Sequence, residues 1–279
     1  MKEEGRACMK GSKKERLDVV LVDKNLAATR EKAKKMIMAG LVFVNEQRID
    51  KPGTRIDTDL AIEIKGNPNP YVSRGGLKLE KALDLFDFPV KGLNFLDIGA
   101  STGGFTDCLL KNGAEKVYAI DVGYGQLAWE LRQDKRVIVM ERTNIRNLNK
   151  AQIKDPIDGA VIDVSFISLK LVLPVIKDII RNKANIIALV KPQFEVGKGK
   201  VGKKGVVRDE NLHIEVLISM LTFAESMGLT PVNLDFSPIT GPEGNIEFLL
   251  HLYKGNLEDH IITDSKVNET VKKAHSLLR

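Results

Sequence analysis

The chain has 279 residues, 43% of them apolar and 29% charged, which is typical of a globular protein with one or two domains. Its two cysteines, Cys8 and Cys108, form neither a disulfide framework nor a zinc-ligand pattern, a usage that is typical of a reducing compartment. The charged N-terminus and the lack of an apolar run near the ~20 residues of a membrane span argue against a secreted or membrane protein, so we expect a cytoplasmic one.

The net charge of +6 favours nucleic acid as a partner, and the distribution of the charge strengthens this indication. Residues 10–35 contain nine Lys/Arg against four Asp/Glu, and residues 196–208 contain five Lys/Arg and no acidic residue. We expect both segments to contact phosphates.

Residues 10–66 predict a small α+β domain. Apolar spacing over residues 17–21 and 33–37 predicts two short helices, the second with Thr29 as its N-cap and Gly40 as its C-terminal stop. Strands are expected at 41–44 and, as an edge strand, at 60–64, and a Pro/Asn-rich linker at 67–70.

From Tyr71 the pattern changes to an amphipathic helix over 76–86, after which strands and helices alternate. This alternation predicts an α/β domain over 71–255, with a mostly parallel sheet that binds its ligand at the carboxyl ends of the strands. The last two strands follow one another without a helix, and a polar tail, which can form a loosely held helix, covers 256–279. The strands are expected at 93–98, 117–121, 137–141, 159–163, 186–190, 231–236 and 247–253, and the helices between them at 104–112, 127–131, 169–180 and 211–227.

A run of small residues, Gly99 to Gly104, leaves the first of these strands and enters a helix, where backbone N–H groups can approach a ligand closely. The spacing is not the dinucleotide fingerprint, because Ser101 replaces its second glycine, and no Gly-Lys-Ser/Thr ending marks a phosphate loop. Asp121 ends the next strand, where a carboxylate can accept both hydroxyls of a ribose. The alternative is a tight turn with a solvated acid nearby.

This loop resembles the S-adenosylmethionine (SAM) motif of class I, Rossmann-like methyltransferases. It is most similar to the Gly-Ala-x-x-Gly-Gly-aromatic string of FtsJ-type ribose 2'-O-methyltransferases, with Phe105 at the aromatic position. The resemblance implies SAM as the cofactor, with its methionine part against residues 99–104 and its ribose on Asp121. The cofactor-binding residues so implied are Asp97, Gly99, Ala100, Ser101, Gly103, Gly104, Phe105, Asp121, Val122, Asn144 and Asp163.

Charged residues stand where two further strands are expected to end, Asp163 after the fourth and Lys191 after the fifth. Each alone is most simply a surface charge, but two at successive strand ends point to one cleft. A ribose hydroxyl must lose its proton, or be positioned, to attack a methyl group in line, and a lysine held near carboxylates can assist. With Lys78 and Glu247 these residues resemble the Lys-Asp-Lys-Glu tetrad of FtsJ-like enzymes, in which the second lysine, here Lys191, is the central group.

Other methylation chemistries are less well supported. Base amino-methyltransferases typically carry Asn/Asp-Pro-Pro-aromatic after the fourth strand, whereas this chain has Asp163-Val-Ser-Phe166. Cytosine C5 methylation needs a cysteine nucleophile, but Cys108 is expected in the core of a helix. The four histidines have no metal-ligand spacing, so we expect no metal and place each histidine at the surface. They are residues 213, 251, 260 and 275.

The strings Arg16-Leu-Asp-Val-Val-Leu21, Thr29-Arg-Glu-Lys-Ala33 and Ile37 to Asn45 resemble the S-four RNA-binding domain. With both domains, the chain resembles the TlyA family, named hemolysins but behaving as ribosomal RNA 2'-O-methyltransferases. This implies a cytidine ribose in the RNA of one or both ribosomal subunits as the target. The RNA-binding residues expected are Arg16, Arg30, Lys34, Lys35, Arg74, Lys198, Lys200, Lys203 and Lys204.

Two other functions stay open from the sequence. One is a membrane-active hemolysin, against which the lack of a span argues. The other is a non-catalytic RNA-binding or ribosome-assembly factor that retains SAM binding, against which the complete tetrad argues.

Overall fold

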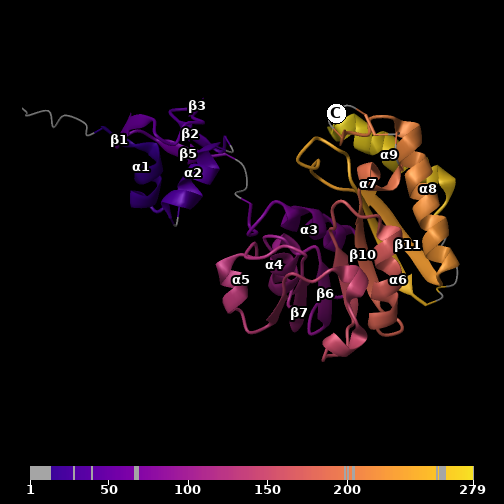
Figure 1. Cartoon of the computed structure of the whole chain (residues 1–279). Helices are drawn as coiled ribbons and strands as arrows, with labels where there is room; N and C mark the ends of the chain where they lie inside the picture. The colour runs from indigo at the N-terminus through magenta and orange to yellow at the C-terminus, as the bar shows by residue number, and fades with distance from the viewer. Residues whose placement is uncertain are drawn as a thin grey trace, which may run out of the picture. The chain divides into compact units, whose positions relative to one another are not determined.

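The computed structural model describes residues 14–27, 29–38, 40–65, 69–197, 199, 201–202, 205–255, 257 and 262–278. The chain forms two compact units that divide between Pro70 and Tyr71 (Figure 1).

The first unit packs two helices beside short antiparallel strands. Its core includes Leu17, Leu21 and Ile37, all fully buried. The predicted helix ends are confirmed, because Thr29 Oγ1 accepts a hydrogen bond from Lys32 N at 3.2 Å and Gly40 has a φ of 71°. The elements are β1 (Lys14–Arg16), α1 (Leu17–Asp23), α2 (Arg30–Met38), β2 (Val42–Val44), β3 (Gln47–Arg48), β4 (Arg55–Asp57) and β5 (Ile62–Ile64), with strand order β3-β2-β5 in one sheet and β1-β4 in the other.

The second unit is built on a sheet of seven described strands in the order β11-β12-β10-β9-β6-β7-β8. The five strands from β10 to β8 run parallel, and β12 pairs antiparallel with both β10 and β11. The predicted α/β class with a mostly parallel sheet is therefore confirmed. The strands are β6 (Asn94–Ile98), β7 (Lys116–Ile120), β8 (Val137–Met140), β9 (Gly159–Ile162), β10 (Asn185–Val190), β11 (Leu229–Phe236) and β12 (Phe248–Lys254).

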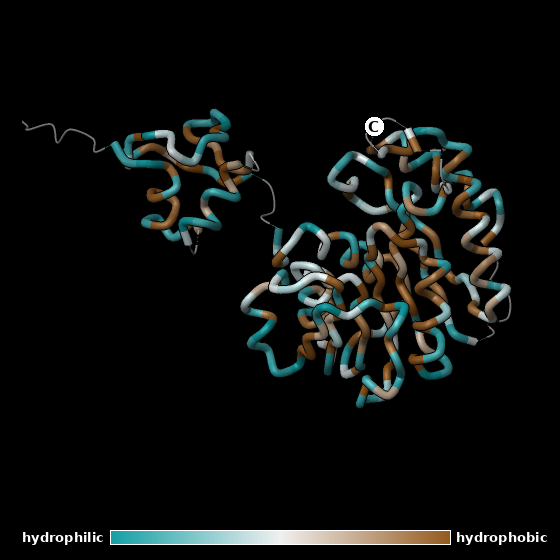
Figure 2. The backbone as a smooth tube through the Cα atoms, viewed as in Figure 1, coloured by the Kyte–Doolittle hydropathy of each residue, from teal (hydrophilic) through white to brown (hydrophobic). Residues whose placement is uncertain are grey.

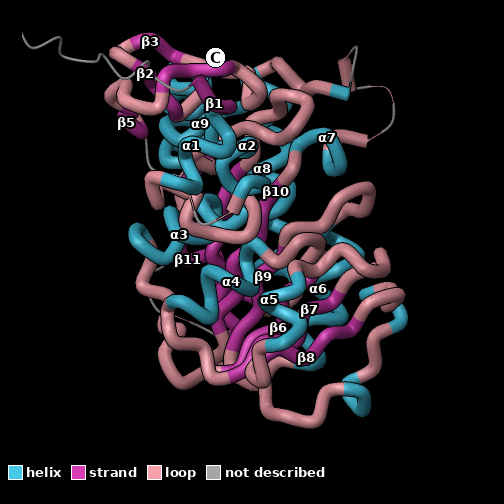
Figure 3. The backbone as a smooth tube through the Cα atoms, turned by 90° about the vertical axis from the view of Figure 1, so that its left-hand side faces the viewer, coloured by secondary structure: helices cyan, strands magenta, loops and turns pink. Residues whose placement is uncertain are grey.

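Helices cover both faces of this sheet, as Figure 3 shows. Successive residues of β6 point to opposite faces, so that Phe95 belongs to the core on the side of α3, α4 and α5, and Leu96 to the core on the side of α6, α8 and α9. Figure 2 shows the resulting concentration of hydrophobic residues in the strands. The helices are α3 (Gly75–Leu85), α4 (Gly104–Lys111), α5 (Trp129–Gln133), η1 (Ile145–Asn147), η2 (Lys150–Gln152), α6 (Leu169–Ile179), α7 (Pro192–Glu195), α8 (Glu210–Ser226) and α9 (Asp264–Leu278).

The C-terminal segment, expected to be a polar tail, contains the packed helix α9. Its buried residues Val267, Val271 and Ala274 recur at helical spacing and join the core formed with α8 and β11. In the parts of the chain that the structure describes, no helix is long and apolar enough to cross a membrane.

The expectation of surface histidines was wrong for two residues. His213 and His251 are 0% and 2% exposed. Each is buried with polar partners, His251 between Asn185 and Asn233, and His213 with its Nδ1 atom 3.0 Å from His275 Nε2. The residue at position 260 lies outside the described residues. Cys108 is buried in α4, as predicted.

Candidate active site

Glycine at position 99 brings the ends of two neighbouring strands together. Gly99 has a φ of 85°, and a Cβ atom there would lie 2.5 Å from the carbonyl oxygen of Asp163. The loop after β6 therefore lies directly against the loop after β9. The chain continues from β6 to β7 on one side, whereas β9 lies on the other, so this is the point where ligands bind in open α/β sheets.

Asp121 ties the loop after β6 to the loop after β7. Its Oδ2 atom accepts a hydrogen bond from Ser101 N at 2.8 Å, and its Oδ1 atom accepts one from Gly123 N at 2.7 Å. Each carboxylate oxygen keeps a further lone pair that can receive a ribose hydroxyl. Asp121 can therefore hold the two loops together and bind a ligand at the same time.

Two further glycines of the loop are required by packing. A Cβ atom at Gly103, whose φ is 97°, would lie 2.2 Å from Leu131 Cδ1, so this glycine makes room for α5. A Cβ atom at Gly104 would lie 2.3 Å from Ser73 Oγ and 2.8 Å from Gly76 N. Gly104 thus allows the first turn of α4 to contact the first turn of α3, which carries Lys78.

The chain's one tryptophan lies beside this loop. Trp129 is the first residue of α5 and is 72% exposed. The residue before it, Ala128, donates a backbone hydrogen bond to the carbonyl oxygen of Thr102 at 3.1 Å. The start of α5 is therefore attached directly to the loop.

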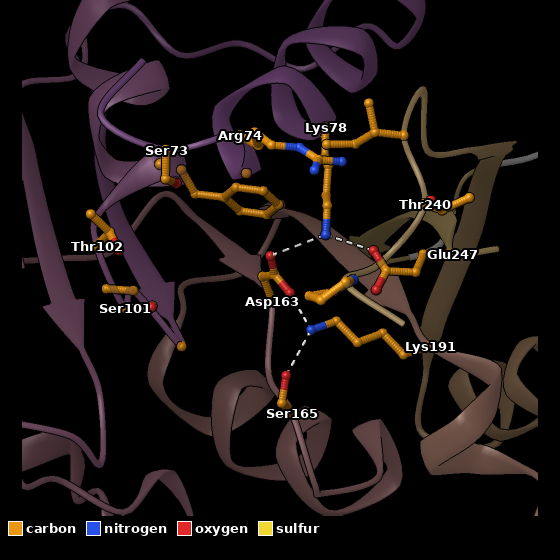
Figure 4. Close-up of a pocket in the computed structure, with 17 residues that line it drawn as sticks. Ser73, Arg74, Lys78, Ser101, Thr102, Asp163, Ser165, Lys191, Thr240 and Glu247 are labelled. Atoms are coloured by element: carbon orange, nitrogen blue, oxygen red, sulfur yellow. Dashed lines mark hydrogen bonds and ion pairs between the residues drawn. The ribbon is translucent and has the colours of Figure 1, made fainter. Parts of the chain in front are cut away.

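A pocket of about 360 Å³ opens between this loop, the start of α3, the ends of β9 and β10, and residues 239–247 (Figure 4). Five predicted cofactor residues, Asp97, Gly103, Asp121, Val122 and Asn144, are not part of its wall. The predicted residues that the structure brings together on the wall are Arg74, Lys78, Gly99, Ala100, Ser101, Gly104, Phe105, Asp163, Lys191 and Glu247.

The four residues expected to form the catalytic tetrad are in contact with one another. Lys78 Nζ donates to Glu247 Oε2 at 2.6 Å and lies 3.8 Å from Asp163 Oδ2. Lys191 Nζ lies 2.6 Å from Asp163 Oδ1 (Figure 4). The two ammonium groups alternate with the two carboxylates, so the charges of the cluster balance.

Burial makes this cluster sensitive to the loss of any member. Lys78 and Lys191 are 8% and 7% exposed, and Glu247 is 1% exposed. Burial raises the pKa of the Glu247 carboxyl, while the Lys78 ammonium opposes that rise. Replacing one charged side chain by a neutral one would leave its partner as an unpaired charge in a poorly solvated place. Such a substitution strongly destabilises a protein.

Asp97 lies one layer below the loop and is fully buried. Its Oδ2 atom accepts a hydrogen bond from Thr106 Oγ1 at 2.5 Å, whereas its Oδ1 atom has no hydrogen-bond partner in the described part of the chain. Burial raises the pKa of the Asp97 carboxyl to about 7, against the hydrogen bond from Thr106. A buried acceptor beside a loop of small residues fits a ligand that carries a cationic amino group, as SAM does.

Among the residues that the sequence analysis missed are two that follow Asp163. Ser165 lines the pocket and accepts a hydrogen bond from Lys191 Nζ at 2.9 Å. Phe166 is 91% exposed with a φ of 64°, and its ring lies 5.2 Å from that of Phe194. The available signal was their place directly after a strand that ends in a functional aspartate, because such positions face the ligand edge of the sheet.

The predicted RNA-binding residues have different environments. Arg16 and Arg30 both bind the buried carboxylate of Asp18, at 2.9 and 3.0 Å, and remain about half exposed. These guanidinium groups lower the pKa of Asp18 to about 2, the hydrogen bond from Arg16 being the largest cause. Lys34 binds Glu31 at 2.6 Å, and Lys35 and Arg74 are exposed. The four loop lysines, at positions 198, 200, 203 and 204, lie outside the described residues.

Val122 and Asn144 follow the ends of β7 and β8. Val122 is 70% exposed, and the Asn144 side chain caps η1 by accepting a hydrogen bond from Arg146 N at 3.0 Å. In the described residues no group of histidine, cysteine or acidic side chains has the arrangement of a metal site.

Comparison with known proteins shows which protein family has this fold and this set of residues. The family model described as "FtsJ-like methyltransferase" matches residues 71–254, and the S4 domain model matches residues 15–62. The chain belongs to the FtsJ-like methyltransferase family. Like other members of this family it uses SAM, whose methionine part the loop from Gly99 to Phe105 is suited to hold.

Relatives of this FtsJ-like chain match over almost its whole length. The protein YqxC of Bacillus subtilis is 56% identical over 96% of both chains. The 16S/23S rRNA (cytidine-2'-O)-methyltransferase TlyA of Mycobacterium tuberculosis is 45% identical over 86% of this chain and 90% of that protein. A solved structure from Streptococcus thermophilus is 48% identical, with a TM-score of 0.75 over 95% of this chain and 96% of that one.

Proposed function

We propose that this enzyme methylates the ribose 2'-hydroxyl of a cytidine in ribosomal RNA. The observation that carries the proposal is the buried, alternating cluster of two lysines and two carboxylates on the wall of the pocket that the cofactor loop also lines. The class of RNA comes from the name of the tuberculosis relative and is supported by the S4 domain at the N-terminus.

Each residue of the cluster has a different role in activating the ribose hydroxyl. When bound, SAM supplies a methyl group on a positively charged sulfur. After it has released its own proton to solvent, Lys191 Nζ takes the proton of the ribose hydroxyl while the oxygen attacks, and Asp163 stabilises the ammonium that forms again. Lys78 contacts both Asp163 and Glu247, so it fixes the carboxylate that orients Lys191.

Exposed groups near the pocket are suited to contact the RNA. Arg74 lines the pocket and is exposed, which places a guanidinium where a phosphate next to the target ribose can bind. Phe166 offers an exposed ring face three residues after Asp163, and unstacked bases in RNA commonly pack on aromatic rings. Arg30, Lys34 and Lys35, with Arg16, are proposed to bind a more distant RNA segment. The loop lysines 198, 200, 203 and 204 are proposed to bind phosphates near the target nucleotide.

The test is methyl transfer from labelled SAM to separated ribosomal RNAs, followed by mapping of alkali-resistant linkages. We expect one such linkage at a cytidine in at least one of the RNAs. Methylation of a base, or of no RNA at all, would reject the proposal. In the second case a non-catalytic factor that binds SAM would be the better description, and liposome leakage would test for a membrane-active protein.

The same assay tests the role of Lys191. Lys191→Ala should lower the single-turnover rate by roughly 10²–10⁴-fold, the usual contribution of a positioned general base, while SAM and RNA still bind. Asp163→Ala and Lys78→Ala should act in the same direction, and the losses should not add, because the groups act as a unit. A near-wild-type single-turnover rate for Lys191→Ala would exclude the tetrad as the catalytic group.

A further inference from the structure

Lys191 has two polar partners, and only one of them belongs to the tetrad. Its Nζ atom forms an ion pair with Asp163 Oδ1 at 2.6 Å and donates a hydrogen bond to Ser165 Oγ at 2.9 Å. Among the described residues Asp163 Oδ1 has no partner in hydrogen-bond geometry, so Ser165 is the acceptor that orients the amine. Both partners come from the segment that follows β9, and Figure 4 shows the Lys191 nitrogen between them. The pocket wall includes all three side chains.

The geometry of an amine nitrogen gives this second contact a consequence. A neutral lysine has two N–H bonds and one lone pair around a tetrahedral nitrogen, and only the lone pair can take a proton. The ion pair with Asp163 attracts the nitrogen but leaves rotation about the Cε–Nζ bond open. The hydrogen bond to Ser165 fixes the direction of one N–H bond and so restricts the directions that the lone pair can take.

The fold holds Ser165 firmly enough for this task. The segment 163–168 is attached to β9 at one end. At its other end Ser168 Oγ donates to Glu195 Oε2 at 2.6 Å, and Leu169 N donates to Glu195 Oε1 at 2.8 Å. Glu195 ends α7, four residues after Lys191, so the segment with both partners is tied to the segment with Lys191.

We propose that Ser165 is a positioning residue for methyl transfer: it accepts a hydrogen bond from Lys191 Nζ, beside the ion pair with Asp163, and so directs the nitrogen lone pair at the ribose hydroxyl. The proposal rests on the proposed function, since it assigns Lys191 the role of proton acceptor. Ser165 adds no charge, in contrast to Asp163, so its contribution is one of direction. Losing it should reduce the rate of the chemical step and leave the binding of both substrates in place.

The experiment compares three variants of the full-length enzyme with the wild type. Ser165→Ala removes the acceptor. Ser165→Thr keeps the hydroxyl, and its additional methyl group has room because Ser165 is exposed. Ser219→Ala is the matched control, because Ser219 accepts a similar hydrogen bond from Lys170 Nζ, at 2.7 Å, on the exposed surface of α8. Single-turnover rates on ribosomal RNA are measured at saturating SAM and RNA, with SAM affinity by calorimetry and RNA affinity by filter binding.

We expect Ser165→Ala to reduce the single-turnover rate roughly 10–100-fold, the size of effect that misplacement of a reacting group produces, with both affinities within about twofold of wild type. Ser165→Thr should recover most of the rate, and Ser219→Ala should match the wild type. A Ser165→Ala enzyme with the wild-type rate, a Ser165→Thr enzyme as slow as Ser165→Ala, or a parallel loss of SAM affinity would each overturn the positioning role.

These outcomes are separable from failure of the proposed function. Lys191→Ala is measured alongside. If it is inactive while Ser165→Ala retains the full rate, the proposed function stands and only the role of Ser165 is rejected. If Lys191→Ala is as active as the wild type, the role of Lys191 itself is rejected.

Discussion

At Asp97, a buried acid with one unsatisfied oxygen opposes the stability of the ligand-free fold. Its carboxyl ordinarily titrates near 3.8, but burial raises its pKa to about 7. Between these values the unfolded chain is ionised at this residue, whereas the folded chain keeps its proton. The free energy of unfolding therefore falls as the pH rises from about 4 to about 7 through this group, and a cationic ligand would offset that loss.

The fall of the free energy of unfolding with rising pH gives a direct prediction for Asp97→Asn. The variant cannot ionise, so its melting temperature without ligand should exceed that of the wild type increasingly as the pH rises from about 4 to about 7, and the difference should then level off. SAM affinity should fall in the same variant, because the negative charge is lost. Thermal unfolding at a series of pH values measures the first effect and calorimetry the second. Other titrating groups are common to both proteins, so parallel melting curves would contradict the raised pKa of Asp97.

At the scale of the elements, the strands and helices of the second unit were predictable because the sheet is buried on both faces. Apolar runs such as residues 186–190 end at charged or glycine-rich positions, which mark the strand ends. The short helix α7 was not predicted, because its residues 192–195 begin with a proline and form a single turn. Helix α9 was expected as a loosely held helix in a polar tail, because just one of its faces is apolar. Its burial depends on contact with α8 and β11, which the sequence does not show.

The site shows a similar division. Asp163 and Lys191 were predicted from their places at strand ends, and the contact between them follows from the pairing of β9 with β10. Lys78 and Glu247 were added by family resemblance. The contact of Ser165 with Lys191 depends on the path of a loop, which no periodic pattern encodes. Gly103 was predicted as a cofactor-binding residue, whereas the atoms nearest to a Cβ placed there belong to Leu131 and Leu127. The sequence showed that a glycine is needed at position 103, but it did not show that Leu131 and Leu127 are the side chains that leave no room for a Cβ atom there.

This difference predicts distinct effects for two substitutions near the loop. Gly103→Val should lower the melting temperature, because its φ of 97° and the contact with Leu131 both disfavour a side chain. Asp121→Ala should instead weaken SAM binding, by about 1–3 kcal/mol for lost hydrogen bonds to a buried polar group. Adding Leu131→Ala to Gly103→Val should recover part of the lost stability. A Gly103→Val protein with a wild-type melting temperature would refute the packing role.

At the scale of the whole molecule, the chain combines a unit that carries the chemistry with one whose S4 match and exposed basic side chains suit RNA. Each unit has its own hydrophobic core, so loss of the first should leave the second folded. In the division of labour that we propose, the first unit binds structured RNA and the second unit methylates it.

Deletion of residues 1–70 tests this division. SAM affinity should be unchanged, because every residue of the pocket lies after Pro70. Methylation of ribosomal RNA should fall strongly, because phosphate contacts supply much of the affinity for RNA. Calorimetry and labelled-SAM transfer measure the two properties. If the shortened enzyme methylated ribosomal RNA as fast and as selectively as the full chain, the first unit would not be the targeting device.

The position of Trp129 gives this protein a built-in optical probe. Because the indole is the chain's one tryptophan and is largely exposed, excitation near the red edge of protein absorbance samples a single site. That site is attached through Ala128 to the loop that is suited to hold SAM. Ordering of the loop should therefore change the intensity or wavelength of the emission. Unlabelled protein can then be titrated with SAM by fluorescence alone, and the variants described above can be ranked in a single cuvette.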